Sequence, residues 1–274
     1  MVLTTALDCS QDKSKQFFVM AGFVSSTERW ADFDGEWRKR LADDGLAYFH
    51  MQPFTQSVHQ PTGPFDKTWT GKEKEPRRQK LLMDLLGIIQ AHAWQKCACI
   101  LPVSSFRMFS EESRRDFVPT MIATAGRLIW ADIESWRRRE RFQNPARIVM
   151  EDGDPEKGTF IEAINHVTGR EPSFESKKDI PKKGIAAFTP LQAADILAYE
   201  MQKLTQRFEE RLDGMSFRFP YHQLERIHGD IKVLGSEGTQ MLDEVMRVTR
   251  YFDINPLGSK VLPAGQVKPR QGER

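Results

Sequence analysis

Apolar residues near the start of the chain form two short segments with a strand-like pattern. Val2 to Leu7 is short and rich in residues that favour strands, and Gln16 to Val24 is rich in Phe and Val. Polar residues over positions 11–14 separate the two segments and are typical of a turn. The pattern predicts a β-hairpin.

The hydrophobic period then changes to that of a helix. Ser25 precedes Glu28 by three residues, the spacing of a capping box at a helix start. Large apolar side chains then recur at helical spacing until Gly45 ends the pattern. These side chains are Trp30, Phe33, Trp37 and Leu41. They predict an amphipathic helix whose aromatic stripe packs into the core.

The following segment mixes short apolar runs with a long polar stretch. Leu46 to Met51 has the length of a short strand and places His50 at its end. Residues 52–75 are rich in Pro, Gly, Thr and Lys with little periodicity, which predicts a long loop and a mobile flap over a site. A helix from Pro76 and a strand from Lys96 to Val103 come next.

Helix and strand patterns alternate through the second half of the chain. A helical region follows Ser110 and reaches about Arg141, and Pro119 is expected to bend or break it. Ala146 to Met150 predicts a buried strand. Asp154, which precedes a proline, predicts the start of the next helix.

The clearest helix start lies after a lysine-bearing loop and a short strand. The loop is predicted over residues 176–184 and the strand over Ile185 to Phe188. Thr189 and Gln192 have capping-box spacing, and Pro190 lies between them at the first helical position. A helix is therefore predicted from this point.

The C-terminal region predicts further helices and a tail. Helices are expected over residues 221–233 and 239–250. Residues 256–274 are basic, have little apolar periodicity and are expected to be partly disordered. Because strands and helices alternate without an obvious linker, we expect one α/β domain over residues 1–255 with C-terminal helical additions.

Composition narrows the class of protein without selecting a function. The 274 residues include 40 Lys and Arg against 38 Asp and Glu, a formal net charge of +2, and 39% are hydrophobic. These values exclude disordered, collagen-like and coiled-coil proteins. No apolar run approaches the roughly 18 residues of a membrane span, and the first residues do not resemble a secretory signal. Three cysteines are too few for a disulfide framework and favour a reducing cytoplasm, where Cys97 and Cys99 are expected to be packing thiols.

Three carboxylates occur where apolar surroundings predict burial. Asp8 ends the first predicted strand, Glu151 ends a later one, and Asp195 lies in a helix segment that is apolar nearly all round. Burying an ionised carboxylate is costly unless it is paired, hydrogen-bonded or bound to a metal. A helix cap or a salt bridge explains any one of them, whereas three acids brought together suit one or two Mg2+ ions about 4 Å apart. Asp152 would point to the other face of its strand and is a secondary candidate.

Five short motifs, in order over about residues 3 to 205, are similar to one known family. They are Asp8-Cys9-Ser10, the hairpin segment Phe17 to Val24, Phe49-His50-Met51, Val149-Met150-Glu151-Asp152 and Gln192-Ala193-Ala194-Asp195-Ile196-Leu197-Ala198. On these motifs the chain resembles the domain-of-unknown-function family numbered 3800, which is considered ribonuclease-H-like. The resemblance implies an α/β fold with a ribonuclease-H-like mixed sheet, flanked by helices, in which acids converge on metal ions.

The resemblance also implies an activity and its residues. Asp8, Glu151 and Asp195 would be metal ligands and catalytic groups, Asp152 a further candidate ligand, and His50 a residue lining the site. The implied cofactor is Mg2+ or Mn2+. The implied reaction is phosphodiester hydrolysis in a nucleic acid, with DNA and RNA both open. Independently of the resemblance, the position of His50 makes it a candidate general base.

One departure from the family keeps a second function open. The family usually has Asp-Glu-Ser-Gly where this chain has Asp8-Cys9-Ser10-Gln11, so an acid and a glycine are missing. On an alternating strand the missing acid would face away from Asp8. The alternative to a nuclease is a non-catalytic binding or scaffold protein that retains the fold.

Basic segments bear on nucleic acid as a partner. Arginines gather over residues 137–147 and lysines over 177–183, and Trp130 and Trp136 lie near the arginines. A solvated surface explains these segments, and so do phosphate contacts with some base stacking. The chain has no glycine-rich phosphate loop and no Gly-x-Ser-x-Gly motif, which argues against ATPases, dinucleotide enzymes and serine hydrolases.

Overall fold

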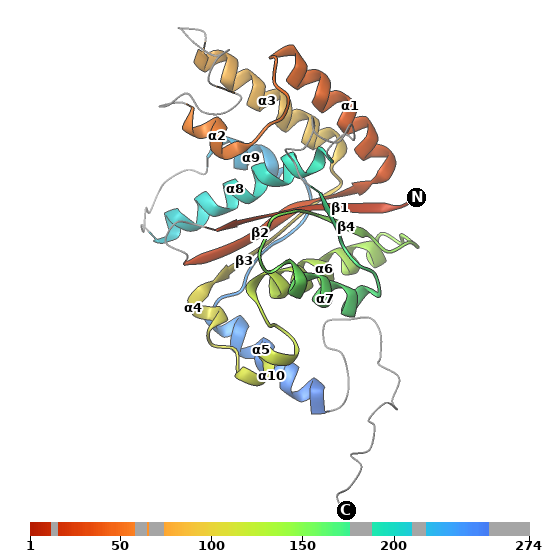
Figure 1. Ribbon diagram of the computed structural model, residues 1–274, viewed down its shortest axis with the longest axis vertical. Coiled ribbons are helices and arrows are strands. Elements are labelled where there is room, and N and C mark those ends of the chain that lie inside the picture. The colour runs from red at the N-terminus through yellow and green to blue at the C-terminus, as the bar shows by residue number, and fades with distance from the viewer. Residues whose placement is uncertain (12–15, 58–64, 66–73, 176–187, 210–217, 252–274) are drawn as a thin grey trace, which may run out of the picture.

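The computed structural model describes residues 1–11, 16–57, 65, 74–175, 188–209 and 218–251, and a six-stranded sheet runs through its centre (Figure 1). The described strands are β1 (Leu3–Gln11), β2 (Phe17–Ser26), β3 (Gln95–Pro102), β4 (Arg147–Glu151), β5 (Ser173–Glu175) and β6 (Ile231–Val233). Their order across the sheet is β5-β4-β1-β2-β3-β6. β2 pairs antiparallel with β1 and β3, whereas β4 pairs parallel with β1 and β5, and β6 with β3. The sheet is therefore mixed, as predicted.

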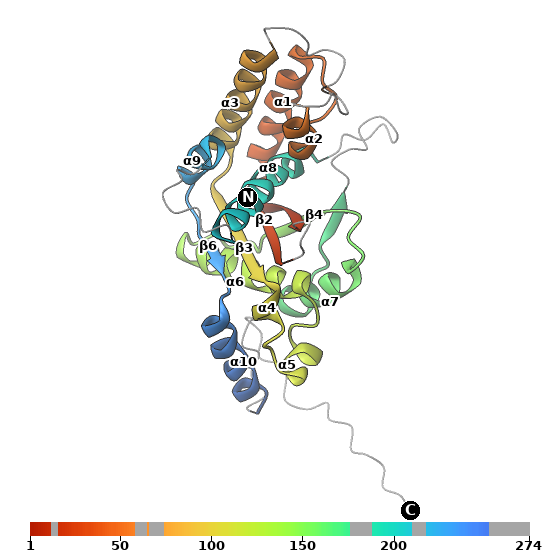
Figure 2. The ribbon, with the colours of Figure 1, turned by 90° about the vertical axis from the view of Figure 1, so that its left-hand side faces the viewer.

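Helices cover both faces of this sheet. In chain order the described helices are α1 (Thr27–Asp43), α2 (Met51–Gln56), α3 (Lys74–His92), α4 (Val103–Phe106), α5 (Glu111–Asp116), α6 (Met121–Arg139), α7 (Lys157–Thr168), α8 (Pro190–Glu209), α9 (Phe219–Glu225) and α10 (Ser236–Tyr251). α1, α3 and α8 lie on one face, and α6 and α7 lie on the other (Figures 1 and 2). None of these described helices is both long enough and apolar enough to cross a membrane.

The predicted hairpin and the helix after it are confirmed, with one shift at their junction. β2 continues through Ser26, and α1 begins after that residue rather than after Ser25. The Ser26 hydroxyl accepts a hydrogen bond from the Arg29 amide (3.2 Å). The Ser25 hydroxyl instead donates to the His92 carbonyl (2.6 Å), so it ties β2 to the end of α3.

The aromatic stripe of α1 forms the core beneath α8 and α3. Phe33, Trp37 and Phe49 are fully buried in one cluster. The rings of Phe33 and Trp37 stack with centroids 4.9 Å apart. Aromatic side chains of this size each bury about 150–250 Å2 on folding. The prediction that the stripe is core is therefore confirmed.

The opposite face packs against α6 and α7. Gly126 of α6 permits their close approach, because a Cβ at this position would lie only 2.5 Å from Cε2 of Phe160 on α7. Cys97 and Cys99 of β3 are buried in the same cluster as Phe160. Both are free cysteines that pack in this core, as predicted.

The three cysteines are expected to differ sharply in reactivity. Burial raises the pKa of the Cys97 thiol far above its usual range, and raises that of Cys99 to about 12. The thiolate is the reactive form of cysteine. Cys97 and Cys99 therefore stay protonated and unreactive at pH 8 in the folded chain. A disulfide reagent should modify one thiol per native molecule, the half-buried Cys9, and three in urea. Rapid modification of all three in the native protein would contradict this packing.

Leu46 to Met51 forms no strand, contrary to the prediction. Residues 46–50 have no regular structure, and α2 begins at Met51. Leu46 and Phe49 are three residues apart and both pack into the cluster of Trp37. The apolar residues of this irregular segment therefore point into the same core, instead of alternating between the two faces of a sheet.

The predicted helix over residues 221–233 is wrong in its second half. α9 ends at Glu225, and the chain returns to the sheet as β6 beside β3. Gly229 has a φ of 123°, and a Cβ there would lie 2.9 Å from the carbonyl carbon of Lys96. A positive φ at Gly229 is incompatible with a helix continuing to residue 233, and glycine adopts it without strain.

The helix predicted from Asp154 begins three residues later, at Lys157. The Asp154 carboxylate accepts from the Glu156 amide (2.8 Å), so it stabilises the preceding turn rather than the helix itself. Gly169 ends α7 with a φ of 66°, as expected of a helix-terminating glycine. The predicted break of the Ser110–Arg141 region is confirmed, because α5 and α6 flank Pro119.

Several predicted segments lie outside the described residues. They are most of the flap over 52–75, the lysine-bearing loop over 176–184, the strand over 185–188 apart from Phe188, and the tail over 256–274.

Candidate functional site

Asp8 faces α8 from the middle of the sheet. Side chains two apart on a strand share a face. Ala6 packs in a cluster with Leu191 of α8, and the Ser10 hydroxyl donates to Oε1 of Gln202 on the same helix (2.9 Å). Asp8, between Ala6 and Ser10, is thus directed to the same side and is 4% exposed. β1 continues to Gln11, so Asp8 lies within the strand and not at its end as predicted.

Glu151 ends β4, the strand that pairs with the strand of Asp8. β4 pairs in parallel with β1 in a register that joins Ala6 to Val149 and Leu7 to Met150. The paired residues end at Leu7 and Met150, so Asp8 and Glu151 are the next residue along each of these neighbouring strands. Val149 packs with Ala6 below α8, so Glu151, two residues later, shares that face. We call Asp8 and Glu151, with Asp195 above them, the acid face.

Asp195 is contributed by α8. Gln202, which contacts β1, lies seven positions further along α8, which is about two helical turns. The side chains of Asp195 and Gln202 therefore lie on the same stripe of the helix. The Asp195 carboxylate is 7% exposed. Its Oδ2 accepts a hydrogen bond from the Met51 amide (2.6 Å), and its Oδ1 lies 3.3 Å from Nε2 of His50. A buried acid is thus stabilised by one amide and one imidazole.

His50 immediately precedes α2, in extended backbone with a φ of −149°. Its side chain is 15% exposed and turned to Asp195. The structure therefore brings together two of the predicted site residues, His50 and Asp195. The element that carries His50 is an irregular segment, not the strand predicted there.

Gln192 is a residue whose role the sequence pattern misidentified. Capping-box spacing suggests that its side chain serves the start of α8. Its Oε1 instead accepts from the Phe49 amide (2.7 Å) and from Nε1 of Trp37 (3.0 Å). These bonds fix the segment that carries His50. A polar residue at an otherwise apolar helix position was the available signal.

Gln192→Leu should destabilise the protein substantially. It would leave two buried donors, the Phe49 amide and the Trp37 indole, without their acceptor. Each unsatisfied buried group costs about 1–3 kcal/mol, so the free energy of unfolding should fall by about 2–6 kcal/mol in a urea titration. Gln240→Leu, at an exposed position, is the control and should change stability by less than about 0.5 kcal/mol. Equal stability of both variants would contradict the role of Gln192.

Asp152 lies away from the acid face, as the alternation predicted. Its side chain is 52% exposed, and its Oδ1 accepts from Nζ of Lys157 (2.7 Å) and from the Gly153 amide (3.1 Å). Its own amide donates to the Glu175 carbonyl (3.0 Å). These contacts assign Asp152 to the turn after β4.

The chemistry of the acid face suits a hard cation, although its acids do not form a complete cage. Carboxylate oxygens are the ligands that Mg2+ and Mn2+ prefer. Within the described part of the chain, no group of three or more His, Cys, Asp or Glu is arranged to hold a metal ion. Mg2+ is commonly bound by only one or two carboxylates, with water and substrate phosphates as the other ligands. Asp8 and Glu151, on one face of neighbouring strands, are two carboxylates and so match that number and kind of ligand.

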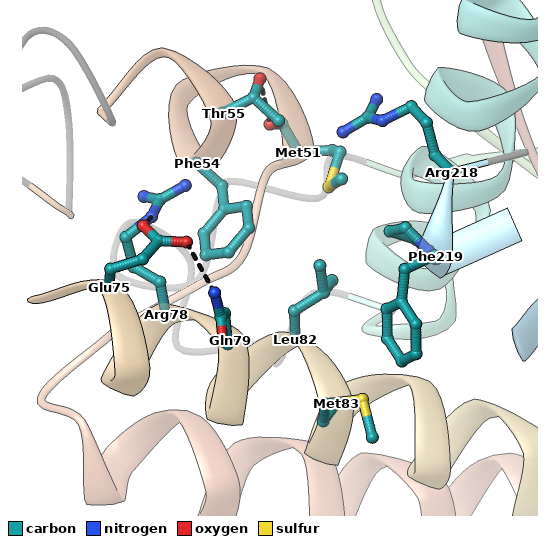
Figure 3. Close-up of a pocket in the computed structure, with 11 residues that line it drawn as sticks. Met51, Phe54, Thr55, Glu75, Arg78, Gln79, Leu82, Met83, Arg218 and Phe219 are labelled. Atoms are coloured by element: carbon teal, nitrogen blue, oxygen red, sulfur yellow. Dashed lines mark hydrogen bonds and ion pairs between the residues drawn. The ribbon is translucent and has the colours of Figure 1, made fainter. Parts of the chain in front are cut away.

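A cavity of about 690 Å3 adjoins this region between α2, α3 and α9 (Figure 3). Its described lining is Met51, Phe54, Thr55, Glu75, Arg78, Gln79, Leu82, Met83, Arg218, Phe219 and Pro220. Two of these residues link it to α8. The Met51 amide bonds Asp195, and the Thr55 hydroxyl lies 3.0 Å from the Tyr199 hydroxyl, one helical turn after Asp195. α2 is thus one wall of the cavity and also contacts Asp195 of the acid face.

The arginines near residue 137 are mostly engaged within the protein. Arg137 and Arg138 both pair with Glu134 (2.7 and 2.9 Å). Trp130 and Trp136 are 4% and 8% exposed and belong to the core. Base stacking on these tryptophans, one of the two explanations considered for the segment, is therefore wrong.

Comparison with protein-family models matched none of them, and comparison with curated proteins found no similar protein.

Proposed function

We propose that the protein is a metal-dependent nuclease that hydrolyses phosphodiester bonds. The observation that carries the proposal is that Asp8 and Glu151 lie on neighbouring paired strands and share the face covered by α8, the helix that contributes Asp195. Three distant segments of the chain contribute these acids. Two of the three, Asp8 and Asp195, are more than nine-tenths buried. A buried ionised carboxylate needs hydrogen bonds, an ion pair or a metal.

Asp8 and Glu151 are the residues that would hold Mg2+ or Mn2+. When bound, the ion would neutralise charge on a phosphate and lower the pKa of a water molecule. The Cys9 amide donates to Oδ1 of Asp8 (2.9 Å), which fixes the carboxylate relative to β1. Asp152 is not part of the proposed set, because it pairs with Lys157 in the adjacent turn.

His50 and Asp195 would handle protons beside the phosphate. An imidazole whose nitrogen faces a carboxylate is held in one orientation, which is what a general acid or base requires. The Oδ1 to Nε2 distance of 3.3 Å and the hydrogen bond from the Met51 amide keep this pair in place.

His50→Gln is expected to lower kcat by about 100-fold or more, the usual contribution of a positioned acid or base. Glutamine retains a polar group of similar length beside Asp195 but transfers no proton at neutral pH. His222→Gln removes an exposed histidine of α9 and serves as the control, which should cleave like wild type. Equal rates for His50→Gln and wild type would remove His50 from the mechanism.

The proposal is tested by incubating the purified chain with single-stranded and double-stranded DNA and RNA. The assay includes Mn2+, Mg2+ or EDTA. We expect cleavage of at least one of the four substrates with Mn2+ and none with EDTA. Absence of cleavage on all four, or cleavage that EDTA does not reduce, would contradict a metal-dependent nuclease.

The second candidate function, a non-catalytic binding or scaffold protein with the same fold, is favoured by one observation. Asp195 is satisfied by the Met51 amide and by His50, as a purely structural acid would be. This candidate predicts nucleic-acid binding or no binding at all, and no dependence of either on divalent ions. Thermal unfolding with and without Mn2+ separates the two, because an ion that binds only the folded chain raises the midpoint.

A further inference from the structure

We infer that the cavity between α2, α3 and α9 binds one nucleotide unit of single-stranded nucleic acid, with the base on its apolar wall and a phosphate at Arg218. This inference rests on the proposed nuclease function and names the form of its substrate. A volume of about 690 Å3 lies within the range of about 300–1,000 Å3 typical of small-ligand sites.

The apolar wall offers surfaces on which a planar base can stack. Phe54, Leu82 and Phe219 line the cavity from three different helices (Figure 3). Phe219 is 47% exposed, unusual for so large an apolar side chain beside a cavity. Stacking on aromatic rings tolerates any base, because every base has a π-face. The wall therefore suits a nucleobase without selecting its identity.

Arg78 supports the wall from behind. Its guanidinium lies 4.1 Å from the centroid of the Phe54 ring, and the side chain is 4% exposed. It donates a hydrogen bond to the Ser57 hydroxyl, while Glu75 lies 3.4 Å from its Nε. A cation stacked on one face of Phe54 fixes the orientation of that ring.

Arg218 supplies the positive charge at the other side of the cavity. It immediately precedes α9, and its guanidinium extends toward Met51 and Thr55 (Figure 3). Its NH1 lies 3.2 Å from Oε1 of the buried Glu200, which holds the group in place, and its side chain is 29% exposed. A guanidinium offers five N–H donors in a planar fork suited to phosphate, so one ion pair does not exhaust it.

The cavity lies next to Asp195 of the acid face, so a nucleic-acid strand bound in the cavity could extend toward the acids. Met51 lines the cavity with its side chain, and its amide binds the Asp195 carboxylate. Thr55 lines the cavity and contacts Tyr199, four residues after Asp195 on α8. A strand with one base in the cavity would thus continue along α8 toward Asp8 and Glu151. A duplex must first unstack and unpair a base to do so, which favours single strands.

The test is a binding measurement in EDTA, so that cleavage plays no part. Fluorescence anisotropy compares a labelled single-stranded thymidine pentamer with the same pentamer carrying an abasic central residue. We expect the complete pentamer to bind about tenfold more tightly than the abasic one, the usual value of one stacked base. Phe219→Ala should abolish this difference. Met241→Ala removes an exposed side chain of α10, at the other end of the molecule, and should preserve it.

A second pair of variants tests the phosphate contact. Arg218→Gln should weaken both pentamers, and Arg218→Lys, which keeps a charge beside Glu200, should weaken them less. Arg115→Gln removes an exposed, ion-paired arginine of α5 and is the control. Circular dichroism of each variant confirms that it is folded.

Competition identifies the form of the ligand. Displacement by a nucleoside monophosphate as strong as by unlabelled pentamer supports the nucleotide site and assigns it to a free nucleotide. Displacement by inorganic phosphate as strong as by the nucleotide would overturn the inference, as would equal binding of complete and abasic pentamers. Metal-dependent cleavage that persists in Phe219→Ala would then leave the proposed function intact.

Discussion

Gly22→Ala is expected to destabilise the fold by about 3 kcal/mol or more. Gly22 lies in β2 opposite Leu7 of β1, at the centre of the sheet. An added Cβ would overlap the carbonyl oxygen of Ala6 and lie 2.8 Å from its carbonyl carbon. Those are backbone atoms of the strand that carries Asp8, so relief requires β1 and β2 to separate. Urea unfolding followed by circular dichroism measures the loss.

Gly35→Ala is the matched control for this substitution. Gly35 lies on the exposed side of α1, and an added Cβ meets nothing within 4 Å. Alanine favours the helix by about 0.5–1 kcal/mol over glycine, so this variant should be slightly more stable than wild type. Similar stability of the two alanine variants would contradict the close approach of β1 and β2.

Asp8→Asn is expected to reduce metal-dependent cleavage by about 100-fold or more while the protein stays folded. Asparagine retains an oxygen for the hydrogen bond from the Cys9 amide (2.9 Å) and nearly the same volume. It removes the negative charge that attracts a divalent ion. Initial rates at saturating Mn2+ measure the activity. The free energy of unfolding should fall by less than about 1 kcal/mol, because asparagine keeps the volume of the side chain and the hydrogen bond from the Cys9 amide.

Two further aspartates serve as controls for the loss of charge. Asp32→Asn removes an exposed acid of α1, and Asp152→Asn removes the acid that pairs with Lys157. Both should cleave within about twofold of wild type, because exposed charges and exposed ion pairs contribute little. Equal loss of activity in Asp8→Asn and Asp152→Asn would show that the acid face has been assigned wrongly.

Where local pattern and tertiary packing agree, the sequence predicted the fold well. The hairpin has clear strand residues on both sides of a polar turn, and α8 has a proline at its first position. The two-residue period of a strand also separated Glu151 from Asp152 correctly. The structure places Asp152 in an exposed turn and Glu151 on the face below α8.

The sequence pattern gave a wrong prediction where an apolar segment packs into the core without forming a strand or a helix. Leu46 and Phe49 enter the core from an irregular segment that Gln192 holds by its side chain. That contact joins residues 143 positions apart, and no local pattern encodes it. The strand β6 was missed for a related reason, because its pairing with β3 depends on the backbone at Gly229.

No local sequence pattern predicts the cavity. Its walls come from α2, α3 and α9, which are separated by long stretches of chain. In the sequence, Phe54 falls in the predicted loop over residues 52–75, and Phe219 precedes the helix predicted over 221–233. Only the fold shows that Phe219 is half exposed and that Arg218 reaches over the same space.

The central claim is that Asp8 and Glu151 bind a divalent ion beneath α8. Its most direct test is a titration with Mn2+, in which electron paramagnetic resonance counts free ion in the presence of a phosphorothioate single strand that resists cleavage. We expect wild type and Asp32→Asn to remove at least one equivalent of Mn2+ from solution. Asp8→Asn combined with Glu151→Gln should remove none. Equal Mn2+ binding by this double variant and wild type, or no binding by wild type, would contradict the assignment of the acid face.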